Sequence, residues 1–122
     1  MDAKKTFLIA PVRGYPPGAW GEYVKTLESD GWSVFWPARD TAQHDDPTGI
    51  RICRDNRTAI GNAHAVHLIW DGKSTGCLFD LGVAWALCKP IIILELPEDA
   101  TNGKSFLRMP RAWAEEGPEV VG

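Results

Sequence analysis

One acidic residue stands inside an apolar stretch that otherwise has the pattern of a buried helix. The stretch runs from Lys73 to Pro90, reads KSTGCLFDLGVAWALCKP, and contains Asp80. The residues three and four positions from Asp80 along a helix are all unable to neutralise it: Gly76, Cys77, Val83 and Ala84. We therefore expect Asp80 to face a polar cavity or to carry a raised pKa. The alternative is an acid at the rim of a sheet, bonded to neighbouring loop amides.

The start of the same stretch has the residue types of an anion-binding helix N-terminus. Ser74 or Thr75 can cap the helix, and Gly76 lets a ligand approach the backbone N–H groups that a helix start leaves unpaired. Such N–H groups carry partial positive charge and favour phosphate. Ser74 also serves as an ordinary cap when no ligand is present.

Apolar runs of strand length alternate with helical patterns along the chain. The four expected strands occupy residues 6–12, 32–36, 65–70 and 90–96. The first helical pattern is an apolar stripe that Gly31 ends, formed by Trp20, Tyr23, Val24 and Leu27. The second begins at an Asp46-Pro47 cap, and its stripe is formed by Ile52, Ala59, Ile60 and Ala63. The third is the stretch around Asp80, and a weaker one over 105–117 is interrupted by Pro110.

Strands that are apolar throughout and separated by helices predict a parallel sheet covered on both faces. The expected fold class is α/β, a three-layer Rossmann-like or flavodoxin-like sandwich with a mostly parallel four- to five-stranded sheet, and residues 1–122 form a single domain. Ligands of such folds bind beyond the carboxyl ends of the strands. The loops to inspect therefore read RGYPPG, PARDTAQHDD and DGKSTG.

Composition limits the partners that the chain can have. A net charge of −3 provides no general attraction to nucleic acid polymers or anionic membranes, so we expect a small-molecule ligand. No apolar run is long enough to span a bilayer, and the three cysteines lack metal or disulfide spacing, which predicts a cytoplasmic protein. We expect no cofactor and no metal, because His64 and His67 would point to opposite faces of a strand.

Three segments resemble the nucleoside 2-deoxyribosyltransferase superfamily. STGCLFDLGVAWALCKPI is similar to its S/D-x-G-x-x-x-E-L-G-x-A-x-A-L-x-K-P element, with Asp80 at the position of the nucleophilic glutamate. FLIAPVRGYPPG resembles the segment YFCGSIRGG of the branch that hydrolyses 2-deoxynucleoside 5-monophosphates, and RDNRTAIGNAHAV resembles RDLxxLxxADVV. The resemblance covers about residues 6 to 95.

The resemblance implies roles for particular residues. Asp80 would be the nucleophile, and Asp55 would hydrogen-bond the base or sugar and assist proton transfer, since its place beside the apolar stripe lets it face the same pocket. Ser74 stands where the hydrolase branch has a serine that contacts the 5-phosphate and where transferases usually carry an aspartate. Arg13 and Gly14 would add a cation and a backbone donor. In the alternative, Arg13 is a solvated loop residue and Asp55 pairs with Arg51 or Arg54.

The expected function is therefore N-glycosidase cleavage of a nucleoside 5-monophosphate, deoxy by resemblance, through Asp80. Base exchange is the second possibility, and a non-catalytic nucleotide-binding module is the third, because aspartate replaces the family's glutamate and shortens the reach. The family's subunits share their sites, and the chain has six tryptophans, so we also expect a homodimer or larger homo-oligomer.

Overall fold

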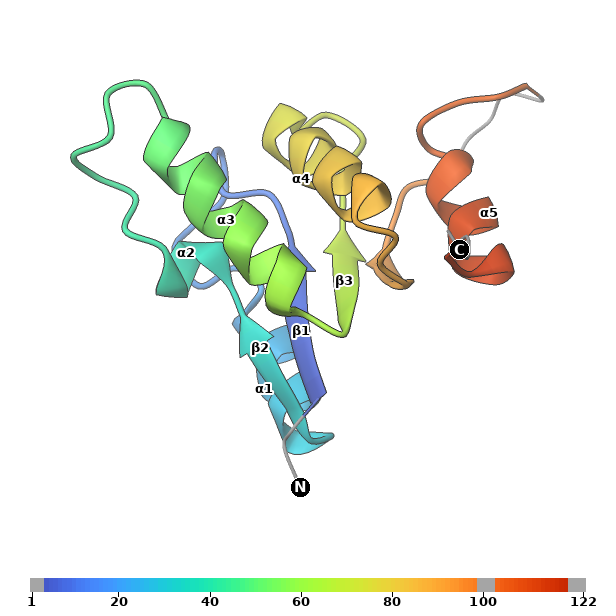
Figure 1. Ribbon diagram of the computed structural model, residues 1–122, viewed down its shortest axis with the longest axis horizontal. Coiled ribbons are helices and arrows are strands. Elements are labelled where there is room, and N and C mark those ends of the chain that lie inside the picture. The colour runs from blue at the N-terminus through green and yellow to red at the C-terminus, as the bar shows by residue number, and fades with distance from the viewer. Residues whose placement is uncertain (1–3, 99–102, 119–122) are drawn as a thin grey trace.

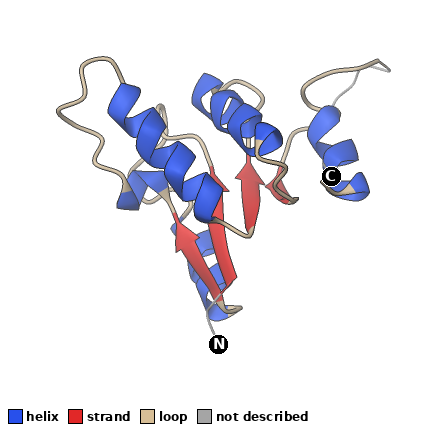
Figure 2. Cartoon of the chain, viewed as in Figure 1, coloured by secondary structure: helices blue, strands red, loops and turns tan. Residues whose placement is uncertain are grey.

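The computed structural model describes residues 4–98 and 103–118, and their strands form one parallel sheet. The strands are β1 (Lys4–Ile9), β2 (Trp32–Phe35), β3 (Ala65–Ile69) and β4 (Ile91–Glu95), in the order β2-β1-β3-β4. This arrangement, with helices on both sides of the strands (Figure 2), confirms the predicted α/β class.

Helices cover the two faces of this sheet, as Figure 1 shows. α3 (Ile50–Asn62) and α4 (Thr75–Ala86) lie on one face, and α1 (Gly21–Ser29) lies on the other. The short α2 (Pro37–Asp40) follows β2, and α5 (Met109–Glu116) packs beside β4. The sheet is therefore the middle of three layers.

The alternation of side chains along β1 divides the core into two parts. Phe7 and Ile9 pack with α3, α4 and Trp113, while Leu8 packs with α1 and β2 residues such as Val34. All five residues of β3 are buried, which is why this strand reads as continuously apolar apart from His67.

His67 is a buried polar residue within this core. Its Nδ1 lies 2.6 Å from Thr6 Oγ1, and its ring meets Trp32 edge to face. Burial lowers the pKa of His67 to about 4, so the ring is neutral at physiological pH.

Several boundaries differ from those predicted. β1 ends at Ile9 and not at residue 12, because Pro11 has no N–H to continue the ladder. α3 begins at Ile50, after Gly49 in the left-handed region at φ 80°, so the predicted Asp46-Pro47 cap is wrong. Asp46 still serves this helix from outside it, since Asp46 Oδ2 accepts the Ile52 N–H at 2.9 Å.

Two further differences concern proline. The segment PARD, expected as loop, forms α2 with Pro37 in its first turn. Pro110 likewise lies in the first turn of α5 and begins that helix, where the prediction had it interrupt one. Both follow from the same property, since the first turn of a helix does not need the N–H that proline lacks.

Side chains donate to one carbonyl group within the edge strand β2 and to three carbonyl groups that flank the edge strand β4. At β2, Arg39 Nη2 donates to the Val34 carbonyl at 2.7 Å. Near β4, Arg111 Nη2 donates to the carbonyls of Leu96 and Pro97, each at 3.0 Å. Trp113 Nε1 donates to the Lys89 carbonyl at 3.1 Å. In the part of the chain described, no helix is long and apolar enough to cross a membrane.

Candidate active site

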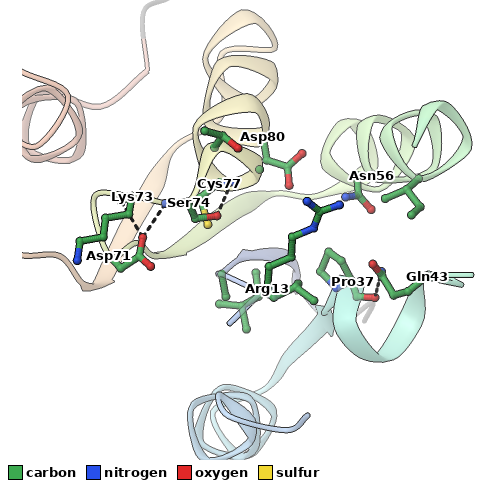
Figure 3. A pocket seen from close by; sticks show the side chains of 15 residues that line it. Arg13, Pro37, Gln43, Asn56, Asp71, Lys73, Ser74, Cys77 and Asp80 are labelled. Carbon is green, nitrogen blue, oxygen red and sulfur yellow. Dashed lines mark hydrogen bonds between the residues drawn. The ribbon is translucent and has the colours of Figure 1, made fainter. Parts of the chain in front are cut away.

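A cavity of about 620 Å³ opens at the carboxyl ends of the strands, where the sequence predicts a ligand. Residues from the loops after β1, β2 and β3 and from α3 and α4 line it (Figure 3). Polar lining residues from each of these sources are Arg13, Gln43, Asn56, Asp71, Ser74 and Asp80. The volume lies within the usual range for small-molecule sites.

Asp80 projects into this cavity from α4. No described residue forms a hydrogen bond or ion pair with its carboxylate, and burial raises its pKa to about 7. Of the two sequence-based alternatives, a polar cavity or a raised pKa, the first agrees with the place of Asp80 in the cavity lining, and the burial of the carboxyl group gives the second as well. A carboxyl group that is partly ionised near neutral pH and is not engaged by the residues around it in the described structure is suited to act on a ligand.

Asp71 lines the same cavity but is fully engaged by the protein. Its Oδ1 accepts the N–H groups of Lys73 and Ser74, both at 2.8 Å, and its Oδ2 accepts the Tyr15 hydroxyl at 2.8 Å. Burial alone would raise the pKa of Asp71, but these hydrogen bonds outweigh it and the pKa is lowered. Asp71 is therefore ionised at neutral pH, and its carboxylate is held by the protein.

The N-terminus of α4 forms one wall of the cavity. Ser74 is its N-cap, as predicted, and Ser74 Oγ accepts the Cys77 N–H at 3.3 Å. A side chain at Gly76 would meet only Ser74 Oγ, at an ordinary 3.9 Å, so packing does not demand a glycine there. Its lack of a side chain leaves the helix start open to the cavity, which suits an anion.

Arg13 extends into the cavity toward Asp80 and Asn56, as Figure 3 shows. It makes no ion pair with any described residue and is free to meet a ligand. Gly14 is not among the residues that line the cavity, and its φ of 83° turns the loop directly after Arg13. The predicted contact of Gly14 with substrate therefore has no geometric support, whereas Arg13 lines the cavity, as its predicted contact requires.

Asp55 lies elsewhere, which corrects the prediction that it faces the pocket of Asp80. It lines a separate groove of about 480 Å³ beside β2, and Arg51 Nη1 lies 3.4 Å from Asp55 Oδ2. The alternative, an exposed acid paired along the helix with Arg51, matches this geometry. Its neighbour Asn56 faces the Asp80 cavity instead.

Asn56 and Asp71 are lining residues that sequence reasoning missed. Asn56 is buried, and its Oδ1 accepts the Thr41 hydroxyl at 3.1 Å. Its spacing of four residues from both Ile52 and Ile60 was a usable signal, because that spacing puts all three on one helix face. For Asp71, the signal was its position in a loop, because an aspartate side chain often accepts the backbone N–H groups two and three residues further along, here those of Lys73 and Ser74.

The described residues contain no cluster of His, Cys, Asp and Glu able to hold a metal ion. Cys77, the cysteine nearest the site, is buried, and this burial raises its pKa to about 12. It is therefore an unreactive core thiol.

Two solved structures share this fold. A 2-deoxyribosyltransferase from Bacillus psychrosaccharolyticus is 20% identical, with a TM-score of 0.61 over 80% of this chain and 77% of that one. These values establish a common fold. A 2-deoxyribosyltransferase from Leishmania mexicana is 18% identical, with a TM-score of 0.58 over 77% of this chain and 65% of that one. No family model and no curated protein matches the sequence.

Proposed function

We propose that the protein is an N-glycosidase that hydrolyses the bond between base and sugar in a 2-deoxynucleoside 5-monophosphate. The observation that carries this proposal is Asp80, a carboxyl group without a partner among the described residues, at one wall of a cavity whose other groups suit a phosphate. The fold shared with two 2-deoxyribosyltransferases supports the same class of chemistry.

The proposed chemistry uses Asp80 as the nucleophile. Breaking an N-glycosidic bond builds positive charge on the sugar, and a carboxylate oxygen can capture it by bonding to the anomeric carbon. The bonding electrons leave with the base, which takes up a proton from solvent. Water then attacks the anomeric carbon, the bond between that carbon and Asp80 breaks to return the carboxylate, and the proton that the water loses goes to solvent. Only the ionised form of Asp80 can perform the first step.

The phosphate would sit between Arg13 and the start of α4. Arg13 supplies a cation, and Ser74 with the first N–H groups of α4 supplies neutral donors. Lys73 also lines this side of the cavity. Asn56 lies on the opposite wall, where its amide group can meet the sugar or base. Asp55 has no part in the proposed reaction.

Base exchange is a second candidate, favoured by the fold neighbours, both of which are transferases by name. In this reaction a nitrogen of a second base, and not water, attacks the glycosyl ester. The third candidate is a nucleotide-binding module that keeps the phosphate seat without turnover, because Asp80 is one methylene shorter than glutamate.

Chromatography of a panel of 2-deoxynucleoside 5-monophosphates, with and without an acceptor base, tests the three candidates. Free base formed without acceptor supports hydrolysis, and a new nucleotide formed only with acceptor supports transfer. Binding without either product supports the module. The Asp80→Asn variant is the control for contaminating activity, since its amide keeps the shape of aspartate and is a poor nucleophile.

We further propose that the protein acts in the cytoplasm as a homodimer or larger symmetric assembly. Its three cysteines are free thiols, which fits a reducing compartment. α4 exposes Phe79 and Trp85 at 57% and 56%, and large exposed apolar side chains suit an interface. A monomer at micromolar concentration in light scattering would contradict the assembly.

A further inference from the structure

One hydrogen bond joins two loops that carry different parts of the cavity. The first loop, residues 10–20, holds Arg13, and the third loop, residues 70–74, leads into α4. Tyr15 Oη in the first loop donates to Asp71 Oδ2 in the third at 2.8 Å. Among the described residues no other hydrogen bond links these loops, which leave the paired strands β1 and β3, so this contact is the hydrogen bond that joins them beyond the sheet.

The first loop is otherwise held by its own residues. Trp20 Nε1 donates to the Pro11 carbonyl at 2.8 Å, and the rings of Tyr15 and Trp20 lie 5.0 Å apart. Gly14 and Gly18 turn the backbone with φ angles of 83° and 80°. The loop is thus an internally braced unit, and the Tyr15 hydroxyl attaches that unit to its neighbour.

The third loop is braced around Asp71. The carboxylate accepts the N–H groups of Lys73 and Ser74, and Trp70 Nε1 donates to the Ser74 carbonyl at 2.9 Å. Asp71 is therefore coupled through short hydrogen bonds to the residue that caps α4. Through Asp71, the Tyr15 hydroxyl therefore links the first loop to the N-terminus of α4.

We propose that Tyr15 and Asp71 are positioning residues that hold Arg13 at a fixed spacing from the N-terminus of α4, so that one phosphate group contacts both. This inference rests on the proposed function, because it assigns the bond a purpose only if the cavity takes a monophosphate. It predicts that loss of the Tyr15–Asp71 hydrogen bond weakens binding of the phosphate group, while the sugar, the base and Asp80 keep their relative positions. A hydrogen bond that only stabilised the fold would not distinguish phosphorylated from unphosphorylated ligands.

The chain offers a matched control for this test. Tyr23 Oη donates to Glu95 Oε2 at 2.9 Å, another tyrosine–carboxylate bond, and neither residue lines the cavity. Tyr15→Phe and Tyr23→Phe therefore remove the same atom from the same kind of bond at two places. A difference in ligand binding between the two variants therefore reports the location of the lost hydrogen bond and not the loss of a tyrosine hydroxyl as such.

The experiment measures dissociation constants by calorimetry for a 2-deoxynucleoside 5-monophosphate and its nucleoside, chosen from the four common bases. For Tyr15→Phe we expect roughly three- to tenfold weaker monophosphate binding, with nucleoside binding unchanged. Where turnover is measurable, KM should rise and kcat at saturation should hold. Tyr23→Phe should alter neither constant. In an Asp71→Asn background, Tyr15→Phe should lose most of its effect, because the partner is already changed.

Distinct outcomes would overturn the positioning role and the proposed function. If the wild type prefers the monophosphate but Tyr15→Phe keeps that preference, or weakens both ligands equally, the positioning role is wrong and the proposed function stands. If Tyr23→Phe has the same effect as Tyr15→Phe, the bond is merely structural. If the wild type binds no monophosphate, the proposed function is wrong, and the positioning role is wrong with it.

Discussion

Asp71 and Asp80 stand on two sides of one cavity in opposite electrostatic situations. Asp71 accepts three hydrogen bonds and its pKa is lowered, whereas Asp80 accepts none from the described residues and its pKa is raised to about 7. The same functional group is thus structural at one position and available for chemistry at the other. Environment, more than residue type, decides which acid can react.

The strongest test of this contrast is Asp80→Asn. If Asp80 is the nucleophile, turnover of a monophosphate should fall by at least about a thousandfold, because an amide attacks carbon poorly. Monophosphate binding should be largely kept, since Asn has the same shape. Asp80→Glu should retain more turnover than Asp80→Asn because it keeps the carboxylate. Equal rates for the wild type and Asp80→Asn in a base-release assay would exclude the catalytic role.

The same substitution should change how stability depends on pH. The pKa of Asp80 is raised above its unfolded value of 3.8, so its contribution to stability is present below about pH 4 and is lost as pH rises to about 7. The free energy of unfolding of Asp80→Asn should therefore exceed that of the wild type by about 2 kcal/mol near pH 8, after allowance for solvent screening. Near pH 4 the two free energies of unfolding should be equal.

Denaturant unfolding of both proteins at the two pH values measures this difference. Asp71→Asn is the contrasting control. The pKa of Asp71 is lowered, so replacing it should destabilise the protein at neutral pH. If Asp80→Asn were also less stable than the wild type near pH 8, the carboxyl group would have a stabilising partner and the contrast would fail.

Ser74→Asp should produce a smaller and selective effect. Aspartate is as good an N-cap as serine, so α4 should keep its start, but its charge would repel a phosphate. We expect roughly tenfold weaker binding of a monophosphate and little change for the nucleoside. Calorimetry with both ligands measures the ratio. An unchanged preference would place the phosphate away from Ser74.

Asp55→Asn should have the smallest effect on activity. Asp55 is half-exposed, lines a separate groove and pairs with Arg51 at 3.4 Å, so turnover should stay within about twofold of the wild type and stability should change by less than about 1 kcal/mol. A large loss of kcat in Asp55→Asn would contradict its placement outside the Asp80 cavity.

Sequence patterns predicted the sheet, its parallel strands and the wall of the cavity around Asp80 and Ser74. These features depend on local signals, namely continuous apolar runs and an N-cap directly before a helix. The side of α3 that faces the cavity was predicted wrongly. Asp55 and Asn56 are adjacent in α3, where successive residues are rotated by about 100°, so only one of them can face the cavity. The resemblance of Arg54-Asp55 to the family's RD segment favoured Asp55, whereas Asn56 is the residue that lines the cavity.

The Tyr15–Asp71 bond lay outside what a sequence pattern can predict. The two residues are 56 positions apart, and neither has a local feature that marks the other as its partner. Their contact depends on the path of the first loop through two glycines with positive φ. Gly14 itself was expected at the ligand, but it does not line the cavity, and its positive φ turns this loop.

The side chains at the two sheet edges restrict how copies of this protein can associate. Arg39 occupies the Val34 carbonyl on the β2 side, and Arg111 and Trp113 occupy carbonyls that flank β4. A strand from a second molecule would have to displace Arg39 before it could pair with β2, and it would meet Arg111 and Trp113 at the two ends of β4. Growth of the sheet from one molecule to the next, the route by which exposed strands form fibres, is therefore hindered at β2 and at the two ends of β4.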